Sequence, residues 1–167
     1  MTPEQIAEIA NISLALSLIV ALVFGIAQVR VAARDRRERL TLEALRNFQS
    51  REFAELIYYI ANRDMPSTRE GLLQLPVNEQ VMLIQFGQEM ESLGMLVSEK
   101  IIDIDLVDKT LGSFVATSWQ KYKLMFEDMR VKTDDPFLGE YFQWLGEEID
   151  ERMKNNPREP FFHTKRP

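Results

Sequence analysis

Residues 12–29 read ISLALSLIVALVFGIAQV, and these 18 residues contain no charged side chain. At about 1.5 Å per residue such a helix reaches roughly 27 Å, so a slightly extended helix spans a hydrocarbon core of about 30 Å. The stretch predicts one transmembrane helix near the N-terminus. A buried core helix is a second interpretation, although it would show a polar face. A cleaved signal peptide is a third, although its N-terminal region would be basic rather than acidic.

Small residues recur at every fourth position of this stretch and share one helix face: Ser13, Ser17, Ala21 and Gly25. Small side chains let a second helix backbone approach closely, which accumulates van der Waals contacts in a bilayer. We expect this face to pack on a transmembrane helix of another protein or of a second copy. Because such residues are common in membrane helices, a chance alignment remains the alternative.

Five arginines follow the apolar stretch directly, and no Lys or Arg precedes it: Arg30, Arg34, Arg36, Arg37 and Arg39. The positive-inside rule predicts that the N-terminus is outside and that residues 30–167 are cytoplasmic, at the inner (cytoplasmic) membrane. The arginines act as a topology signal alone, or they also contact lipid headgroups. Nucleic acid is not an expected partner, because residues 52–167 contain 13 basic and 21 acidic residues and repel phosphates.

The remaining sequence predicts an all-α protein in which the transmembrane helix continues into a small cytoplasmic helical bundle. We expect the transmembrane helix and basic segment over residues 1–39, the helical domain over 40–156 and a flexible tail over 157–167. Because residues 30–61 contain no Pro or Gly, the first helix is predicted to run as one rod to Ala61. Asn78, Asp103 or Asp105, and the pair Asp135-Pro136, predict later helix starts.

Aromatic residues supply much of the predicted core. Trp119, Trp144 and most of the ten phenylalanines fall on helical apolar stripes. An aromatic ligand pocket is the alternative interpretation of the same residues.

The sequence offers little for catalysis. There is no cysteine, and His163 is the single histidine. Asp103, Asp105 and Asp108 lack the glycine and glutamate that a calcium loop needs, and no phosphate-binding or nucleophile motif is present. We therefore expect no catalytic or metal-binding residue, no cofactor and no enzyme activity. Glu91 is expected to pair with Arg130 inside the fold.

Several short motifs between residues 42 and 147 resemble a known family: Met90–Val97 (MESLGMLV), Ile102-Asp103, Leu111-Gly112, Trp119, Arg130 and Tyr141–Leu145 (YFQWL). The family comprises small bacterial, often membrane-anchored, all-helical proteins catalogued as a domain of unknown function. The resemblance implies structural roles for its pattern residues, which are Glu91, Gly94, Asp103, Gly112, Trp119, Arg130 and Trp144. Lys100 departs from the pattern, because a glycine is usual there. The family carries no assigned activity.

The expected function is therefore that of a non-catalytic accessory or assembly subunit of a larger membrane complex. Its expected partners are membrane lipids and, through the transmembrane helix, another membrane protein or itself. A membrane-anchored sensor or defence-type effector that binds a cytoplasmic partner is one alternative. A homo-oligomeric membrane assembly is another.

Overall fold

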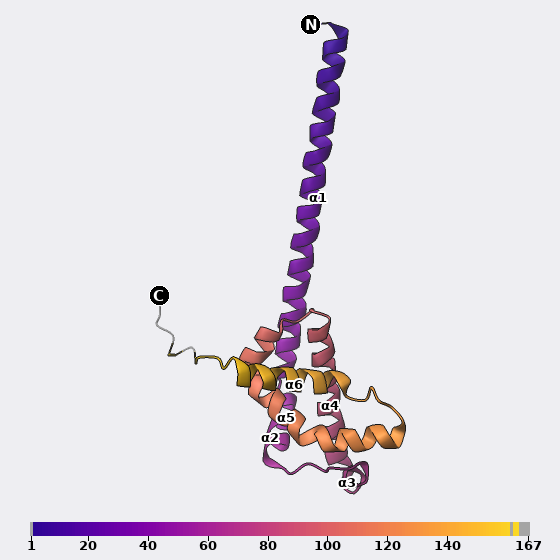
Figure 1. Ribbon diagram of the computed structural model, residues 1–167, viewed down its shortest axis with the longest axis vertical. Helices are drawn as coiled ribbons and strands as arrows, with labels where there is room; N and C mark the ends of the chain where they lie inside the picture. The colour runs from indigo at the N-terminus through magenta and orange to yellow at the C-terminus, as the bar shows by residue number, and fades with distance from the viewer. Residues whose placement is uncertain (1, 161, 164–167) are drawn as a thin grey trace. The chain divides into compact units, whose positions relative to one another are not determined.

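The computed structural model describes residues 2–160, 162 and 163, without the side chains of residues 6–10, 37, 38, 44 and 45 (Figure 1). The protein is all-α, as the sequence predicts. Its helices are α1 (Pro3–Phe48), α2 (Arg51–Asn62), α3 (Arg69–Leu73), α4 (Val77–Ser98), α5 (Ile104–Thr133) and α6 (Glu140–Asn155). The chain divides into two compact units, residues 1–43 and residues 44–167, which we call the helical unit.

The first unit contains most of α1. Between Asn11 and Phe48 this helix is long and apolar enough to cross a membrane by length and composition, and none of its most apolar window is buried. All described side chains from residue 11 to residue 36 are exposed. A buried core helix is therefore not what these residues form, and α1 is a candidate membrane span or signal sequence.

The prediction of one rod to Ala61 is wrong, because α1 ends at Phe48 and α2 begins at Arg51. Ser50 is extended, and its side chain accepts a hydrogen bond from the backbone N–H of Phe53 at 3.1 Å. A serine in this position caps a new helix, which outweighs the absence of Pro or Gly. The break lets the rings of Phe48 and Phe53 meet edge to face, 4.9 Å apart.

The core of the helical unit lies where α6 packs across α5 and α4 (Figure 1). Four buried aromatic rings form its centre: Phe86, Trp119, Tyr122 and Phe142. The ring centroids of Trp119 and Phe142 are 5.3 Å apart, and those of Phe86 and Tyr122 are 5.4 Å apart. Edge-to-face and tilted pairs at such distances add to the stabilisation from burial.

Trp144 does not belong to this core, contrary to the prediction, since it is 39% exposed. On α6, Phe142, Leu145 and Ile149 share the buried face. Trp144 lies two residues from Phe142, about 200° around the helix, and so points away from that face. Phe53, Phe86, Phe126 and Phe142 are buried, whereas Phe137 and Phe162 are exposed.

Of the predicted helix starts, Asp103 is confirmed, Asp135-Pro136 is wrong, and the helix predicted near Asn78 is present but begins at Val77, so only the cap assigned to Asn78 is wrong. Asp103 caps α5 by accepting a hydrogen bond from the N–H of Asp105 at 2.9 Å. Asn78 lies inside α4, which follows Pro76 without a side-chain cap. Asp135 accepts from the N–H of Phe137 at 3.0 Å, but this bond closes a turn, and α6 begins only at Glu140.

The delayed start of α6 has its cause in Gly139. This residue is left-handed, with φ of 71°, and a Cβ there would lie 2.4 Å from Cε1 of Phe126. The chain therefore passes tightly over the Phe126 ring before α6 can begin, and only glycine combines this φ with this contact.

The short helix α3 and one long-range cap were not predicted. Five residues are too few for a periodic pattern, and α3 begins where Thr68 accepts a hydrogen bond from the N–H of Gly71 at 3.1 Å. The Nζ of Lys121, from α5, donates to three carbonyl oxygens at the end of α2, those of Ile60, Ala61 and Arg63, at 2.7, 2.9 and 3.1 Å. These bonds satisfy acceptors that the end of α2 leaves free.

Candidate functional site

The four small residues of α1 lie on an open face of the helix. Ser13, Ser17, Ala21 and Gly25 are all exposed, and a Cβ added at Gly25 would meet nothing within 4 Å. The Ser17 hydroxyl donates to the Ser13 carbonyl oxygen at 2.8 Å, so its polar group is satisfied within the helix. The face therefore offers small, satisfied residues to a second helix, and its use as a packing surface stays a prediction.

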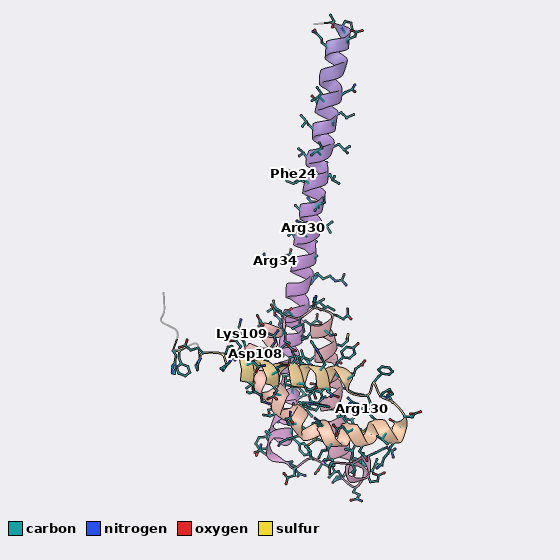
Figure 2. The ribbon with its side chains drawn as sticks, in the orientation of Figure 1. Phe24, Arg30, Arg34, Asp108, Lys109 and Arg130 are labelled. Atoms are coloured by element: carbon teal, nitrogen blue, oxygen red, sulfur yellow. The ribbon has the colours of Figure 1, made fainter. Side chains whose placement is uncertain are left out.

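The arginine band follows on the same helix. Arg30, Arg34, Arg36 and Arg39 are exposed, and Figure 2 labels the first two on α1. The side chain of Arg37 lies outside the described residues. From residue 30 to residue 39 the helix rises about 14 Å, which exceeds the roughly 5–8 Å of one headgroup region, so the band extends from the headgroups beyond them. Contact of these side chains with lipid also stays a prediction.

In the helical unit, the start of α6 is held by residues of the family pattern. Glu91 on α4 accepts hydrogen bonds from the backbone N–H groups of Tyr141 at 3.3 Å and Phe142 at 2.8 Å. The N-cap residue of α6, Gly139, has no side chain to do this. A carboxylate at a helix N-terminus satisfies free N–H groups and interacts favourably with the helix dipole.

The predicted Glu91–Arg130 pair is wrong: among the described residues, Arg130 bonds elsewhere. Its Nε donates to the Leu138 carbonyl oxygen at 2.8 Å, and its Nη1 donates to Oε1 of Gln143 at 2.6 Å. The Glu91 carboxylate binds the free N–H groups at the start of α6. The Arg130 guanidinium instead binds the loop before α6 and the first turn of α6. Arg130 lies near this loop in Figure 2.

Glycines allow α6 to approach both α4 and α5 closely. A Cβ at Gly94 would lie 2.3 Å from the carbonyl oxygen of Tyr141, and one at Gly146 would lie 2.5 Å from Cβ of Trp119. Gly112 faces the Asp108 carboxylate in its own helix. Gly146 was missed by the sequence reasoning, although a glycine inside an amphipathic helix is itself a signal of close packing.

Lys100 occupies the position at which the resemblance implies a glycine, and its φ is 57°. The N–H groups of Ile101 and Lys100 donate to the carbonyl oxygens of Leu96 and Val97, each at 2.9 Å. This is the Schellman ending of a helix, which requires a left-handed residue at the Lys100 position. Glycine would adopt this conformation without strain, and the turn forms with lysine at the cost of some strain.

Several hollows mark the surface of the helical unit. An apolar one, of about 530 Å³, is lined by Leu72, Leu83, Ile84, Gly87, Gln88, Glu91, Ser92, Tyr122, Met125, Phe126, Met129, Leu138 and Gly139. A smaller one, of about 270 Å³, lies beyond Gln88 and Ser92 and is also lined by Phe48, Glu89 and Leu96. A polar one, of about 630 Å³, lies between the start of α5 and the end of α6, beside Asp108 and Lys109, which Figure 2 labels.

The ionisable groups of the apolar hollow serve the fold. Burial raises the pKa of Tyr122 well above its ordinary value, and its hydroxyl donates to the Leu83 carbonyl oxygen at 3.0 Å. Glu91 caps α6. Across the described residues, no group of three or more His, Cys, Asp or Glu side chains is arranged to hold a metal ion.

Most residues of the family pattern thus serve the docking of α6 on α4 and α5, namely Glu91, Gly94, Trp119 and Arg130, whereas Asp103 caps α5 and Trp144 is exposed. A family model described as Domain of unknown function (DUF4760) matches residues 13–149. No curated protein and no solved structure matches the chain. The match begins in the apolar part of α1 and ends inside α6, so it extends beyond the motifs of residues 42–147 into the apolar segment. The chain therefore belongs to the DUF4760 family.

Proposed function

We propose that this chain is a non-catalytic, single-pass membrane protein that serves as an accessory or assembly subunit of a larger membrane complex. The observation that carries the membrane part is the uncovered apolar segment of α1, which no other described residue buries. In water such a surface costs about 25 cal/mol for every Å² exposed, whereas lipid covers it without cost. The interior of a membrane is therefore the most favourable environment for this segment of α1.

The proposed topology follows from the arginines, which lie only on the C-terminal side of the apolar segment. The chain has no cysteine, so single cysteines report cleanly on sidedness. In intact cells, a membrane-impermeant maleimide is expected to label Gln5→Cys but not Gln120→Cys. Lysis should make Gln120→Cys reactive. The reverse labelling would contradict the topology.

Fractionation tests the anchor itself. The full-length chain should remain in the membrane pellet after alkaline extraction and dissolve only with detergent. Recovery in the soluble fraction would contradict the proposal. A mature chain that begins downstream of residue 33 would identify α1 as a signal sequence instead and would contradict it equally.

The accessory role draws its support from the open small-residue face of α1 and from the pattern residues, whose contacts serve packing rather than chemistry. Purification in mild detergent should recover a fixed set of other subunits. Ala21→Leu, which puts bulk on the small face, should release them. Ala15→Leu makes the same change on a different face and should not.

Two results would count against this role. A lone monomer would leave the chain without the complex that the proposal requires. A homo-oligomer with no other subunit would favour the homo-oligomeric assembly instead. If Ala21→Leu and Ala15→Leu released the other subunits to the same extent, the small face would not be the docking surface.

A further inference from the structure

The apolar hollow of the helical unit has the size of a small-molecule site. Its volume of about 530 Å³ falls within the roughly 300–1,000 Å³ that is usual for such sites. The lining comes from α3, α4, α5 and the loop before α6, and along α4 it runs only from Leu83 to Ser92, about 14 Å. The hollow is therefore short and has walls from four segments, unlike the long groove that a docked helix needs.

Gly87 lies in the middle of this lining, and the fold does not require a glycine there. Its backbone is that of an ordinary helix, although glycine inside a helix is less stable than alanine. A Cβ at Gly87 would first meet Cζ of Phe126 at 3.4 Å, an ordinary contact, whereas a Cβ at Gly94 or Gly146 would collide with a neighbouring helix. Close approach of a ligand to the backbone is another ordinary use of glycine, and Gly87 leaves α4 bare at this point of the hollow.

Along α4 the lining of the hollow changes from apolar to polar. It begins with Leu83 and Ile84 and ends with Gln88, Glu91 and Ser92. The helices α3 and α5 add mainly apolar surface: Leu72, Tyr122, Met125, Phe126 and Met129. The flexible thioether side chains of methionine adapt to apolar groups of different shapes. A ligand that matches this lining has an apolar body and one polar group.

Charge determines which polar group suits the hollow. Among the thirteen described residues of the lining, Glu91 is the only Asp, Glu, Lys, Arg or His. Each oxygen of its carboxylate accepts one backbone N–H, from Tyr141 or Phe142, and a carboxylate offers about four acceptor positions, so about two remain. Residues 44–167 contain 15 basic and 21 acidic residues, a balance that also attracts cations. A cationic group is therefore favoured here, and an anionic group is repelled.

We propose that the apolar hollow binds a small molecule that consists of an apolar body and a protonated amine. The body lies against the side chains from α3, α4 and α5 and over the backbone of Gly87. The ammonium donates hydrogen bonds to Glu91 and to the amide oxygen of Gln88, which is three residues away and so on the same side of α4. The site belongs to the helical unit alone, so it does not depend on the proposed membrane role.

Protection of a single cysteine tests binding at this place. In Ile84→Cys the thiol lines the hollow, and in the control Gln120→Cys it lies on the exposed side of α5. The full-length variants, in lysate without detergent, react with an uncharged methanethiosulfonate in the presence of phenylbutylamine, phenylbutanol or phenylbutyrate. These probes share one apolar body and differ only in the polar group. Unreacted thiols are then quantified by a gel shift with a maleimide-linked polymer.

Phenylbutylamine should slow the labelling of Ile84→Cys and leave that of Gln120→Cys unchanged. It should act at about a tenfold lower concentration than phenylbutanol, because a hydrogen bond to a charged group is about twice as strong as a neutral one. Phenylbutyrate should give no protection, since its carboxylate meets the carboxylate of Glu91.

Two substitutions in the Ile84→Cys chain test the assigned roles. Gly87→Ala places a methyl group in the hollow and should raise the protecting concentration of phenylbutylamine severalfold, although the variant should be at least as stable as its parent. Weaker binding without lower stability distinguishes a ligand-binding role from a packing role. Glu91→Gln should make phenylbutylamine and phenylbutanol protect equally. Thermal unfolding followed by circular dichroism controls for the folding of both variants.

Four results would overturn the proposal. One is no protection of Ile84→Cys by phenylbutylamine, and another is equal slowing at Gln120→Cys. The third is protection by phenylbutanol or phenylbutyrate that equals protection by the amine. The fourth is an unchanged protecting concentration in Gly87→Ala, which would show that the hollow beside this glycine is not where the amine binds.

Discussion

Two glycines of α4 permit a controlled test of how α6 is docked. A Cβ at Gly94 would lie 2.3 Å from the carbonyl oxygen of Tyr141 and 2.6 Å from its carbonyl carbon. A Cβ at Gly87 would lie 3.4 Å from the Phe126 ring, an ordinary contact. Both glycines are buried in the same helix. Substitution by alanine therefore gains about the same helix propensity at each position, about 1 kcal/mol. The difference in stability between the two variants then reports the contact of Gly94 with α6.

The contact at Gly94 involves backbone, which cannot rotate aside, so α6 must move by about 1 Å to accept Gly94→Ala. Overpacking of this kind costs about 1–3 kcal/mol. We expect Gly94→Ala to be less stable than Gly87→Ala by about 2 kcal/mol, a factor of about 30 in the folded-to-unfolded ratio. In a unit of this size the gap corresponds to roughly 8 °C in Tm.

The assay is urea and thermal unfolding of the detergent-purified full-length chain, followed by near-ultraviolet circular dichroism, which reports on the buried Trp119. Gly87→Ala should be as stable as the parent chain or more so. If Gly94→Ala matched Gly87→Ala, the close approach of α4 and α6 described above would not exist.

Further predictions concern the helix ends. Lys100→Gly should raise the free energy of unfolding by about 1 kcal/mol, since glycine adopts the left-handed backbone without strain, and an unchanged urea midpoint would speak against the strain. Glu91→Gln keeps an acceptor but removes the charge that caps α6, and should lower the free energy of unfolding by about 1 kcal/mol in the same assay. The backbone N–H of Arg69, at 2.7 Å, and the ammonium of Lys132 lower the pKa of Asp128 from its ordinary 3.8. A carboxylate with a lowered folded pKa stabilises the fold above its ordinary pKa and loses this contribution as pH falls through the folded value. The parent chain should thus be more stable than Asp128→Asn near pH 7 and lose that advantage below pH 3.8, and an advantage that did not change with pH would refute the assignment.

The sequence by itself determines the features that depend on neighbouring residues. An uncharged run of 18 residues makes the part of α1 from residue 12 to residue 29 mainly apolar on every face, whatever follows it. The cap at Asp103 is likewise local, since its side chain accepts a hydrogen bond from the N–H of a residue two positions along the chain. These parts of the prediction are confirmed.

Tertiary structure decided the rest, because the groups involved meet only after the chain has folded. Glu91 lies 50 residues from the N–H group of Tyr141 that it caps, so no local pattern could assign it that role instead of a pair with Arg130. Trp119 on α5 is buried where α6 packs on α5, whereas Trp144 on α6 is exposed, although both tryptophans lie on helices. Likewise, the Phe126 ring, not the Asp135-Pro136 signal, determined that α6 begins only after Gly139.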